Sequence, residues 1–338
     1  MKVAKQWAIL ALVLSVVFGM FGGTAFGAST RYAVVEEVVG VVKVTKAGGS
    51  KEVRVFAGMG LNEGDKLKVG ERSSVTLRIA DREDEIVLGE NWSGTLSKLK
   101  EHDNGGTDTA GKTWAGSMYN NVRKMTGSND TYKVETPTAV MGVRGTHFIL
   151  TIDPRTGLPK IIVNAGRVDA SDKLENGGTV PVLPSQEITL YPGEDPSIGI
   201  DYIDPEDLVI SVDTSVIEKL LRNKAEIDEE NEELLDYLRG TDGEGSTLSL
   251  TDEEILERYR TNVENSLIHI LKFAAEAGKL DETTLNDIIE AANQAIEDIT
   301  KKYDLDRDIP PIDRMAGVDP EVEEQRRRQR EEAEKKDI

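Results

Sequence analysis

The chain has 338 residues, a formal net charge of −21, 38% apolar and 5% aromatic content, and no cysteine. The charge argues against a nucleic-acid partner, because neutralising a phosphate backbone needs clustered Lys and Arg. The absence of cysteine excludes disulfides, thiolate metal sites, cysteine nucleophiles and lipid attachment at an N-terminal cysteine.

The N-terminal segment has the pattern of a signal peptide, predicted over residues 1–27. Lys2 and Lys5 precede an apolar run from Ala8 to Phe21, and small residues follow. We expect cleavage after Gly27 or Ala28, because the peptidase requires small side chains there. The alternative is an uncleaved anchor, since the apolar stretch approaches the roughly 30 Å of a bilayer core. Both alternatives place the remaining chain outside the cytoplasm, either in the periplasm, at a Gram-positive surface or secreted.

Residues 28–198 are predicted to form an all-β domain, because β-branched residues recur at every second position between Gly and Asp clusters. The clearest case is the alternation of Val75, Leu77 and Ile79 with smaller or polar neighbours. The predicted strands are short runs at 39–44, 67–69, 75–79, 85–88, 132–134, 148–152, 161–163 and 187–191. Periodicity alone leaves a small barrel, a sandwich and a β-solenoid-like roll open.

One stretch inside this region departs from strand periodicity. Residues 101–110 are polar and Gly-rich, which predicts a loop. Residues 112–125 then place Trp114, Met118 and Val122 near helical spacing, which predicts a short helix.

The composition changes near residue 199, and residues 199–309 are predicted to be α-helical. Apolar residues at helical spacing mark helices over 216–238, 255–274 and 281–303. We expect these helices to pack together as a small bundle, so the predicted fold class is α+β, with the all-β domain first. Residues 310–338 are nearly all charged and predict a disordered tail or a free helix.

A family resemblance appears within residues 35–168. The run from Glu135 to Phe148, ETPTAVMGVRGTHF, resembles the signature of FecR domains, in which a Thr-Pro, a Val-Arg-Gly-Thr and an aromatic residue follow in that order. Blocks upstream and downstream are similar to the first half and the closing strand of the same family. The resemblance is carried by Gly64, Asp65, Asp81, Thr136, Pro137, Val143, Arg144, Gly145, Thr146, Phe148 and Gly166. It favours a β-solenoid-like roll over a sandwich without excluding the sandwich.

The resemblance also bears on function. The best-known FecR proteins sense iron-uptake signals and control a sigma factor through a cytoplasmic N-terminal domain. Only a few residues precede the apolar run here, which leaves no room for such a domain. The chain therefore resembles the branch of the family in which an extracytoplasmic domain is combined with unrelated segments.

Arg144 is the candidate ligand-binding residue, because a guanidinium between two glycines can bind a carboxylate or a pair of carbonyl groups. The sequence favours a structural interpretation, in which Arg144 satisfies backbone carbonyls or Asp81 within its own fold. Thr138 and Thr146 are expected to be strand-edge hydroxyls rather than nucleophiles.

The sequence predicts no catalytic site, metal site or cofactor. The three histidines, His102, His147 and His269, are scattered, and they form neither an i, i+4 pair nor a cluster with Asp or Glu at the spacing of a metal site. His147 is expected to face solvent from a strand. No nucleophile elbow and no phosphate-binding loop occurs.

Together these features predict a non-enzymatic binding or scaffold module of the bacterial cell envelope, with a glycan or protein ligand. The alternative is a structural or assembly subunit that self-associates through its acidic helices. A regulator of the sigma-factor type and a glycan-active enzyme are less favoured, although carboxylate pairs assembled in space leave no sequence trace. No nucleic-acid partner is expected, and membrane contact is expected only through the N-terminal segment if that segment is uncleaved.

We expect the natively expressed protein to begin at Ala28 or Ser29 and to appear in the soluble extracytoplasmic fraction, because a signal peptidase would remove the preceding segment. Cell fractionation followed by intact-mass analysis measures this directly. An intact N-terminus in the membrane fraction would show that the segment is an anchor.

Overall fold

The computed structural model describes residues 31–103, 105–125, 127, 129–174, 178–240, 253–291 and 320–336. The predicted signal segment, with Gly27 and Ala28, lies outside these residues. The chain from Arg31 onward forms a unit of its own. Among the described residues, none of the helices is both long and apolar enough to cross a bilayer.

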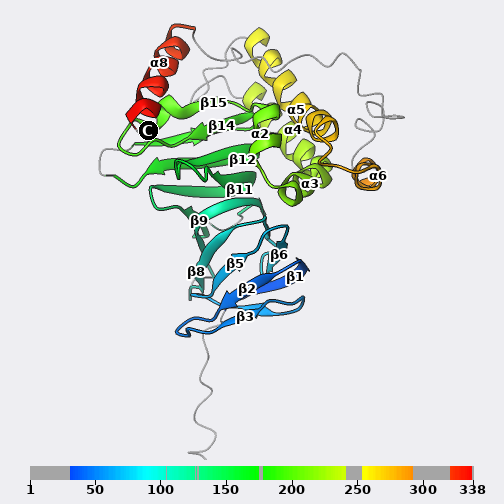
Figure 1. Cartoon of the computed structure of the whole chain (residues 1–338). Coiled ribbons are helices and arrows are strands. Elements are labelled where there is room, and N and C mark those ends of the chain that lie inside the picture. Colours follow the sequence, from blue (N-terminus) through cyan, green and yellow to red (C-terminus); the bar gives the residue numbers. More distant parts are fainter. Residues whose placement is uncertain are drawn as a thin grey trace, which may run out of the picture. The chain divides into compact units, whose positions relative to one another are not determined.

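Fifteen strands among the described residues belong to one hydrogen-bonded sheet. They are β1 (Ala33–Val39), β2 (Val42–Thr45), β3 (Glu52–Arg54), β4 (Gly60–Leu61), β5 (Lys66–Val69), β6 (Ser74–Ile79), β7 (Glu85–Leu88), β8 (Ser93–Glu101), β9 (Thr107–Val122), β10 (Thr131–Glu135), β11 (Ala139–Ile152), β12 (Pro159–Asp172), β13 (Thr179–Val182), β14 (Gln186–Thr189) and β15 (Ile200–Tyr202). The paired strands run antiparallel except β9 and β10, which are parallel. The strands succeed one another from β1–β3 at one end of the sheet to β14–β15 at the other (Figure 1).

The long strand β9 divides the sheet into two arms. Its first half pairs with β8, which continues through β5 to β2 and β3. Its second half pairs with β7, which continues through β6 to β1 and β4. Apolar residues of both arms, such as Val44 and Leu77, belong to the same buried cluster. The sheet therefore rolls over on itself around an inner core.

The helix predicted over 112–125 is wrong, because these residues belong to strand β9 or to the turn after it. Met118 and Val122 face the inner core, whereas Tyr119 packs in a second cluster on the outer face of the sheet. A strand buried on both faces loses the strict alternation of apolar and polar residues. Its apolar spacing can then imitate a helix.

Helices follow the sheet, which confirms the α+β class with a large β region first. They are the 3₁₀ helix η1 (Pro196–Gly199) and the α-helices α2 (Pro205–Ser211), α3 (Thr214–Arg222), α4 (Lys224–Gly240), α5 (Glu253–Glu276), α6 (Glu282–Ala291) and α8 (Pro320–Lys336). The first predicted helix is interrupted at Asn223, which separates α3 from α4. The third continues only to Ala291 within the described residues.

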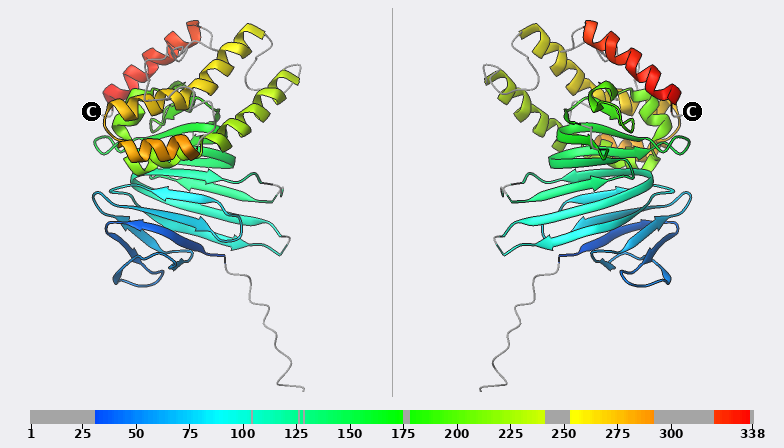
Figure 2. Two further views of the ribbon diagram at one scale, coloured as in Figure 1. Left: turned by 90° about the vertical axis from the view of Figure 1, so that its right-hand side faces the viewer. Right: turned by 90° about the vertical axis from the view of Figure 1, so that its left-hand side faces the viewer.

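The helices do not form a bundle that buries its own apolar stripes. Val87, Tyr119, Ile149 and Ile162, on the outer face of β7, β9, β11 and β12, share one buried cluster with residues of α2 to α6. Figure 2 shows the helices gathered over the β11–β15 end of the sheet. The sheet is therefore covered on its inner face by its own roll, and helices cover the part of its outer face formed by β7, β9, β11 and β12.

The charged C-terminal segment contains a packed helix. Within α8, Arg330 donates hydrogen bonds to the Ile200 carbonyl and to Asp201, each at 3.1 Å. Ala333 is 2% exposed and packs in a cluster with Tyr191 and Ile198. Residues 320–336 thus differ from the predicted disordered tail, while residues 310–319 lie outside the described residues.

Two glycines of the FecR-like signature allow a bend in β11 and β12. The register between these strands shifts within residues 144–148. Gly145 and Gly166 have φ angles of 56° and 75°. A Cβ on Gly166 would lie 2.1 Å from the Gly145 carbonyl oxygen, and a Cβ on Gly145 would lie 2.8 Å from Lys124 Cα. Both positions therefore require glycine, for conformational freedom and for close backbone approach.

We expect Gly166→Ala to lower the free energy of unfolding by about 3 kcal/mol, because the added methyl group meets backbone atoms at a left-handed φ. Gly157→Ala is the matched control, since Gly157 has a φ of 74° and open space around its Cβ position. Conformational strain alone should cost the control about 1–2 kcal/mol. Urea denaturation measures both losses, and equal losses would contradict a close-approach role for Gly166.

Candidate binding cleft

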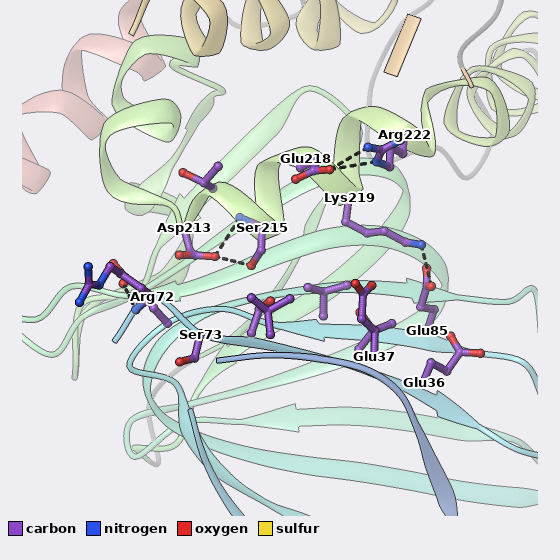
Figure 3. A pocket seen from close by; sticks show the side chains of 16 residues that line it. Glu36, Glu37, Arg72, Ser73, Glu85, Asp213, Ser215, Glu218, Lys219 and Arg222 are labelled. Carbon is purple, nitrogen blue, oxygen red and sulfur yellow. Dashed lines mark hydrogen bonds and ion pairs between the residues drawn. The ribbon is translucent and has the colours of Figure 1, made fainter. Parts of the chain in front are cut away.

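A cleft of about 690 Å³ opens where the helical layer ends. Its floor is the outer face of β1, β6 and β7, and its wall is α3 (Figure 3). The sheet beyond this point has no helical cover among the described residues. The cleft therefore follows from the way the helices cover only part of the outer face.

Helix α3 presents two different faces. Asp213 caps its N-terminus and accepts a hydrogen bond from the Ser215 backbone N–H at 2.9 Å. The apolar face is fully buried and consists of Val216, Ile217, Leu220 and Leu221. The polar face lines the cleft with Thr214, Ser215, Glu218, Lys219 and Arg222. The amphipathic sequence of α3 thus anchors the helix and supplies the polar wall of the cleft.

Carboxylates outnumber cations among the side chains that line the cleft. The acidic residues are Glu36, Glu37, Glu85, Glu90, Asp213 and Glu218, and the basic residues are Arg72, Lys219 and Arg222. The Lys219 Nζ atom lies 2.7 Å from Glu85 Oε1, and Arg222 Nη2 lies 2.8 Å from Glu218 Oε1 (Figure 3). Glu36 also pairs with Arg78, which is not among the lining residues, so Glu37, Glu90 and Asp213 remain against Arg72.

Two charged groups of the cleft are available to a ligand. The Glu37 carboxylate and the Arg72 guanidinium form no hydrogen bond or ion pair with any residue that the structure describes. Glu37 lies at a register shift of β1 and is exposed on the floor. Arg72 adopts a left-handed φ of 49°, and its backbone N–H donates to Glu90 Oε2 at 2.8 Å. The turn after β5 is thereby held in place while the guanidinium stays free.

The uncharged lining of the cleft is also mostly polar. Ser215 hydrogen-bonds to Asp213, but this aspartate acts as the helix cap, and no histidine lines the cleft. Within the described part of the chain, no group of three His, Asp or Glu residues could hold a metal ion. The remaining lining is mostly hydroxyl groups, which can donate to and accept from a polar ligand.

Arg144 lies outside the cleft. It is exposed on β11, directly opposite Arg167 on β12. Asp81 instead pairs with Arg31, whose Nε atom lies 2.6 Å from Asp81 Oδ2. The structural interpretation gave Arg144 either backbone carbonyls or Asp81 as partners, and among the described residues its side chain has neither.

The upstream signature residues Gly64 and Asp65 organise a turn. Asp65 is 1% exposed, accepts hydrogen bonds from the backbone N–H groups of Ala47 and Asn62, and pairs with Lys46 at 2.7 Å. Gly64 has a φ of 87°, which favours glycine. These two residues stabilise the start of β5.

The central signature residues also have structural contacts. Thr136 Oγ1 accepts a hydrogen bond from the Ala139 N–H at 3.0 Å, across the turn that contains Pro137. Val143 and Phe148 are buried in the inner core. Thr146 is fully buried, and its Oγ1 donates to the Arg167 carbonyl at 2.9 Å beside the bend.

A buried polar cluster lies beneath α4, and the predicted solvent-facing position of His147 is wrong. His147 is 0% exposed, and its Nδ1 atom lies 2.6 Å from the Tyr119 hydroxyl. Asn223 donates to that hydroxyl at 2.9 Å, so the Tyr119 proton is available to Nδ1, which favours the Nε2–H tautomer of His147. The Nε2 atom has no hydrogen-bond partner among the described residues and lies 3.8 Å from Glu230 and 3.9 Å from Glu226.

Burial changes the ionisation of this cluster. Burial, with the nearby Arg123 guanidinium, lowers the pKa of His147 to about 3. Burial raises the pKa of Glu230 to about 7, and the neighbouring Glu226 and Glu233 act in the same direction while Lys124 opposes them. His147 is therefore neutral at neutral pH, and Glu230 is the group that titrates there.

The comparisons with known proteins give a limited result. No protein-family model matches the chain, and no curated protein sequence matches it. Two crystal structures of a "putative anti-sigma factor" from Parabacteroides distasonis, at 2.50 Å and 1.65 Å resolution, are similar to it with 17% sequence identity and a TM-score of 0.31. The similarity covers 37% of this chain and 54% of that chain.

We expect Glu230→Gln to raise the melting temperature more at about pH 8 than at about pH 5. A carboxyl group with a pKa raised from 4.5 to about 7 favours the folded state below pH 4.5 and loses that contribution as the pH rises through 7. His147 has a lowered pKa, so it destabilises the folded state as the pH falls below 6.5. This contribution is present in both the wild-type protein and the variant.

The exposed Glu206 on α2 provides the control substitution Glu206→Gln. This variant measures the effect of removing an exposed carboxylate charge at each pH value. A pH-independent effect of Glu230→Gln would contradict the raised pKa.

Proposed function

We propose that this protein is a non-enzymatic, extracytoplasmic binding module of the FecR type, and that its cleft holds a basic segment of another envelope protein. The observation that carries the proposal is the excess of carboxylates in the cleft, with Glu37 unpaired among the described residues. A positively charged side chain entering the cleft would complement this charge.

The lining supports a protein segment over a glycan. Pockets for uncharged ligands are lined mainly by apolar and aromatic side chains. Among the residues that the structure describes, this cleft is lined by charged and hydroxyl side chains together with Val39 and Val87, without an aromatic residue. An extended peptide offers both cationic side chains and backbone groups to such a surface.

The location and the family are supported by the sequence. The lysines, apolar run and small residues of the first segment have the order of an export signal. The FecR-like signature lies in strands and turns where its glycines and threonines have structural contacts, so it supports a scaffold and leaves recognition to other surfaces.

The proposal is tested with a photoreactive amino acid at Thr76, on the floor of the cleft, in cells that express the full chain. We expect an adduct whose yield falls about tenfold in Glu37→Lys, because the substitution replaces attraction with repulsion. The purified adduct partner should contribute a peptide rich in Lys or Arg at the crosslinked position.

Two controls accompany the experiment. Glu206→Lys changes the charge equally on an exposed part of α2, and the photoreactive residue at the exposed Lys133 reports contacts outside the cleft. An adduct whose attached mass is a glycan, or one whose yield Glu37→Lys leaves unchanged, would contradict the proposal.

A further inference from the structure

One face of the β2–β3–β5 arm carries a row of cations, here called the cationic face and defined by Lys43, Arg54, Lys66 and Lys68. Lys43 lies directly opposite both Arg54 and Lys68 in the strand register. Lys66 and Lys68 flank the buried Leu67, so both project from the outer side of β5. The Lys43 and Lys68 side chains are 53% and 67% exposed.

This arrangement is unfavourable for the isolated fold. Like charges that lie directly opposite each other destabilise a sheet. A single carboxylate, Glu52, is shared between Lys43 at 3.2 Å and Lys68 at 2.9 Å. Hydrogen bonds from Lys68 and Lys43 lower the pKa of Glu52. The cations thus outnumber their acidic partner on this face.

The local charge contrasts with that of the whole chain. Residues 40–70 contain six basic and three acidic residues, although the chain as a whole has a net charge of −21. A negative surface would attract the cationic face and repel most of the remaining molecule. The charge distribution therefore favours one orientation at such a surface.

Apolar side chains are exposed beside the cations. Phe56 is 61% exposed and Val41 is 47% exposed. Arg54 Nη2 donates to the Gly40 carbonyl at 3.0 Å, which places this cation at the turn that carries Val41. An anionic polymer would use only the charges, whereas a lipid interface can accommodate both the cations and the apolar side chains.

We propose that the cationic face, with Phe56 beside it, docks on the surface of an anionic phospholipid bilayer. This end of the sheet is where the described chain begins, since β1 starts at Ala33 and β1–β3 lie together there (Figure 1). In the sequence, the apolar run that ends at Phe21 precedes Arg31 by a short segment. Membrane docking of this face goes beyond the cleft and does not depend on what the cleft binds.

The test uses the full chain, whose lack of cysteine allows a unique fluorescent label at Phe56→Cys. Vesicles of phosphatidylcholine alone are compared with vesicles that also contain phosphatidylglycerol. A neutral aqueous quencher measures access to the label without responding to protein charge. We expect several-fold slower quenching on the anionic vesicles, and loss of this protection at high salt because screening weakens surface electrostatics.

Ile210→Cys is the matched label control, because Ile210 is a 71% exposed apolar residue on α2. Its quenching should be the same on both kinds of vesicle. Protection at position 56 should be lost in the triple variant Lys43→Gln, Lys66→Gln, Lys68→Gln. It should persist when Lys100, Lys133 and Arg155, which are exposed elsewhere, are replaced by Gln.

Three results would overturn the proposal. Equal quenching at position 56 on neutral and anionic vesicles would show that the face does not recognise anionic lipid. Equal protection of positions 56 and 210 would indicate adsorption without orientation. Protection by soluble polyphosphate but not by vesicles would assign the cationic face to an anionic polymer.

Discussion

The apolar outer face of β7, β9, β11 and β12 is the constraint on which the rest of the structure depends. Val87, Tyr119, Ile149 and Ile162 project from this face and are nearly or fully buried. Burying a side chain of this size contributes about 1.5–3 kcal/mol. The face therefore requires a cover, and α2 to α6 supply it. The helices are part of the same folding unit as the sheet for this reason.

The position of the cover also creates the two polar features of the outer face. Where α4 crosses the sheet, its Glu230 carboxylate lies over His147. Burial lowers the pKa of His147 and raises the pKa of Glu230. Where the cover ends at α3, the polar side of that helix lies above the uncovered β1 and β6. A helix that must be amphipathic to pack thus brings a charged surface to the edge of the sheet.

The two arms of the roll differ in charge. The β7–β6–β1 arm lines the acidic cleft, and the β5–β2–β3 arm carries the cationic face. Both arms contribute to one inner core, so the orientation of their outer faces relative to each other is fixed. If both proposals hold, one rigid roll presents different charges to a protein partner and to a lipid surface.

The sequence by itself determined many of the strands and helices, because their apolar residues follow a regular period or form short β-branched runs. The alternation at 75–79 predicted β6, and the helical stripe up to Ala274 predicted α5. It did not determine β9 or the position of His147, because burial on both faces removes the alternation that reveals a strand. The cleft was also missed, since its lining comes from β1, β6, β7 and α3, with only the amphipathic α3 as a local signal. Tertiary structure alone decided these features, because periodicity reports which residues are buried and not which distant residues bury them.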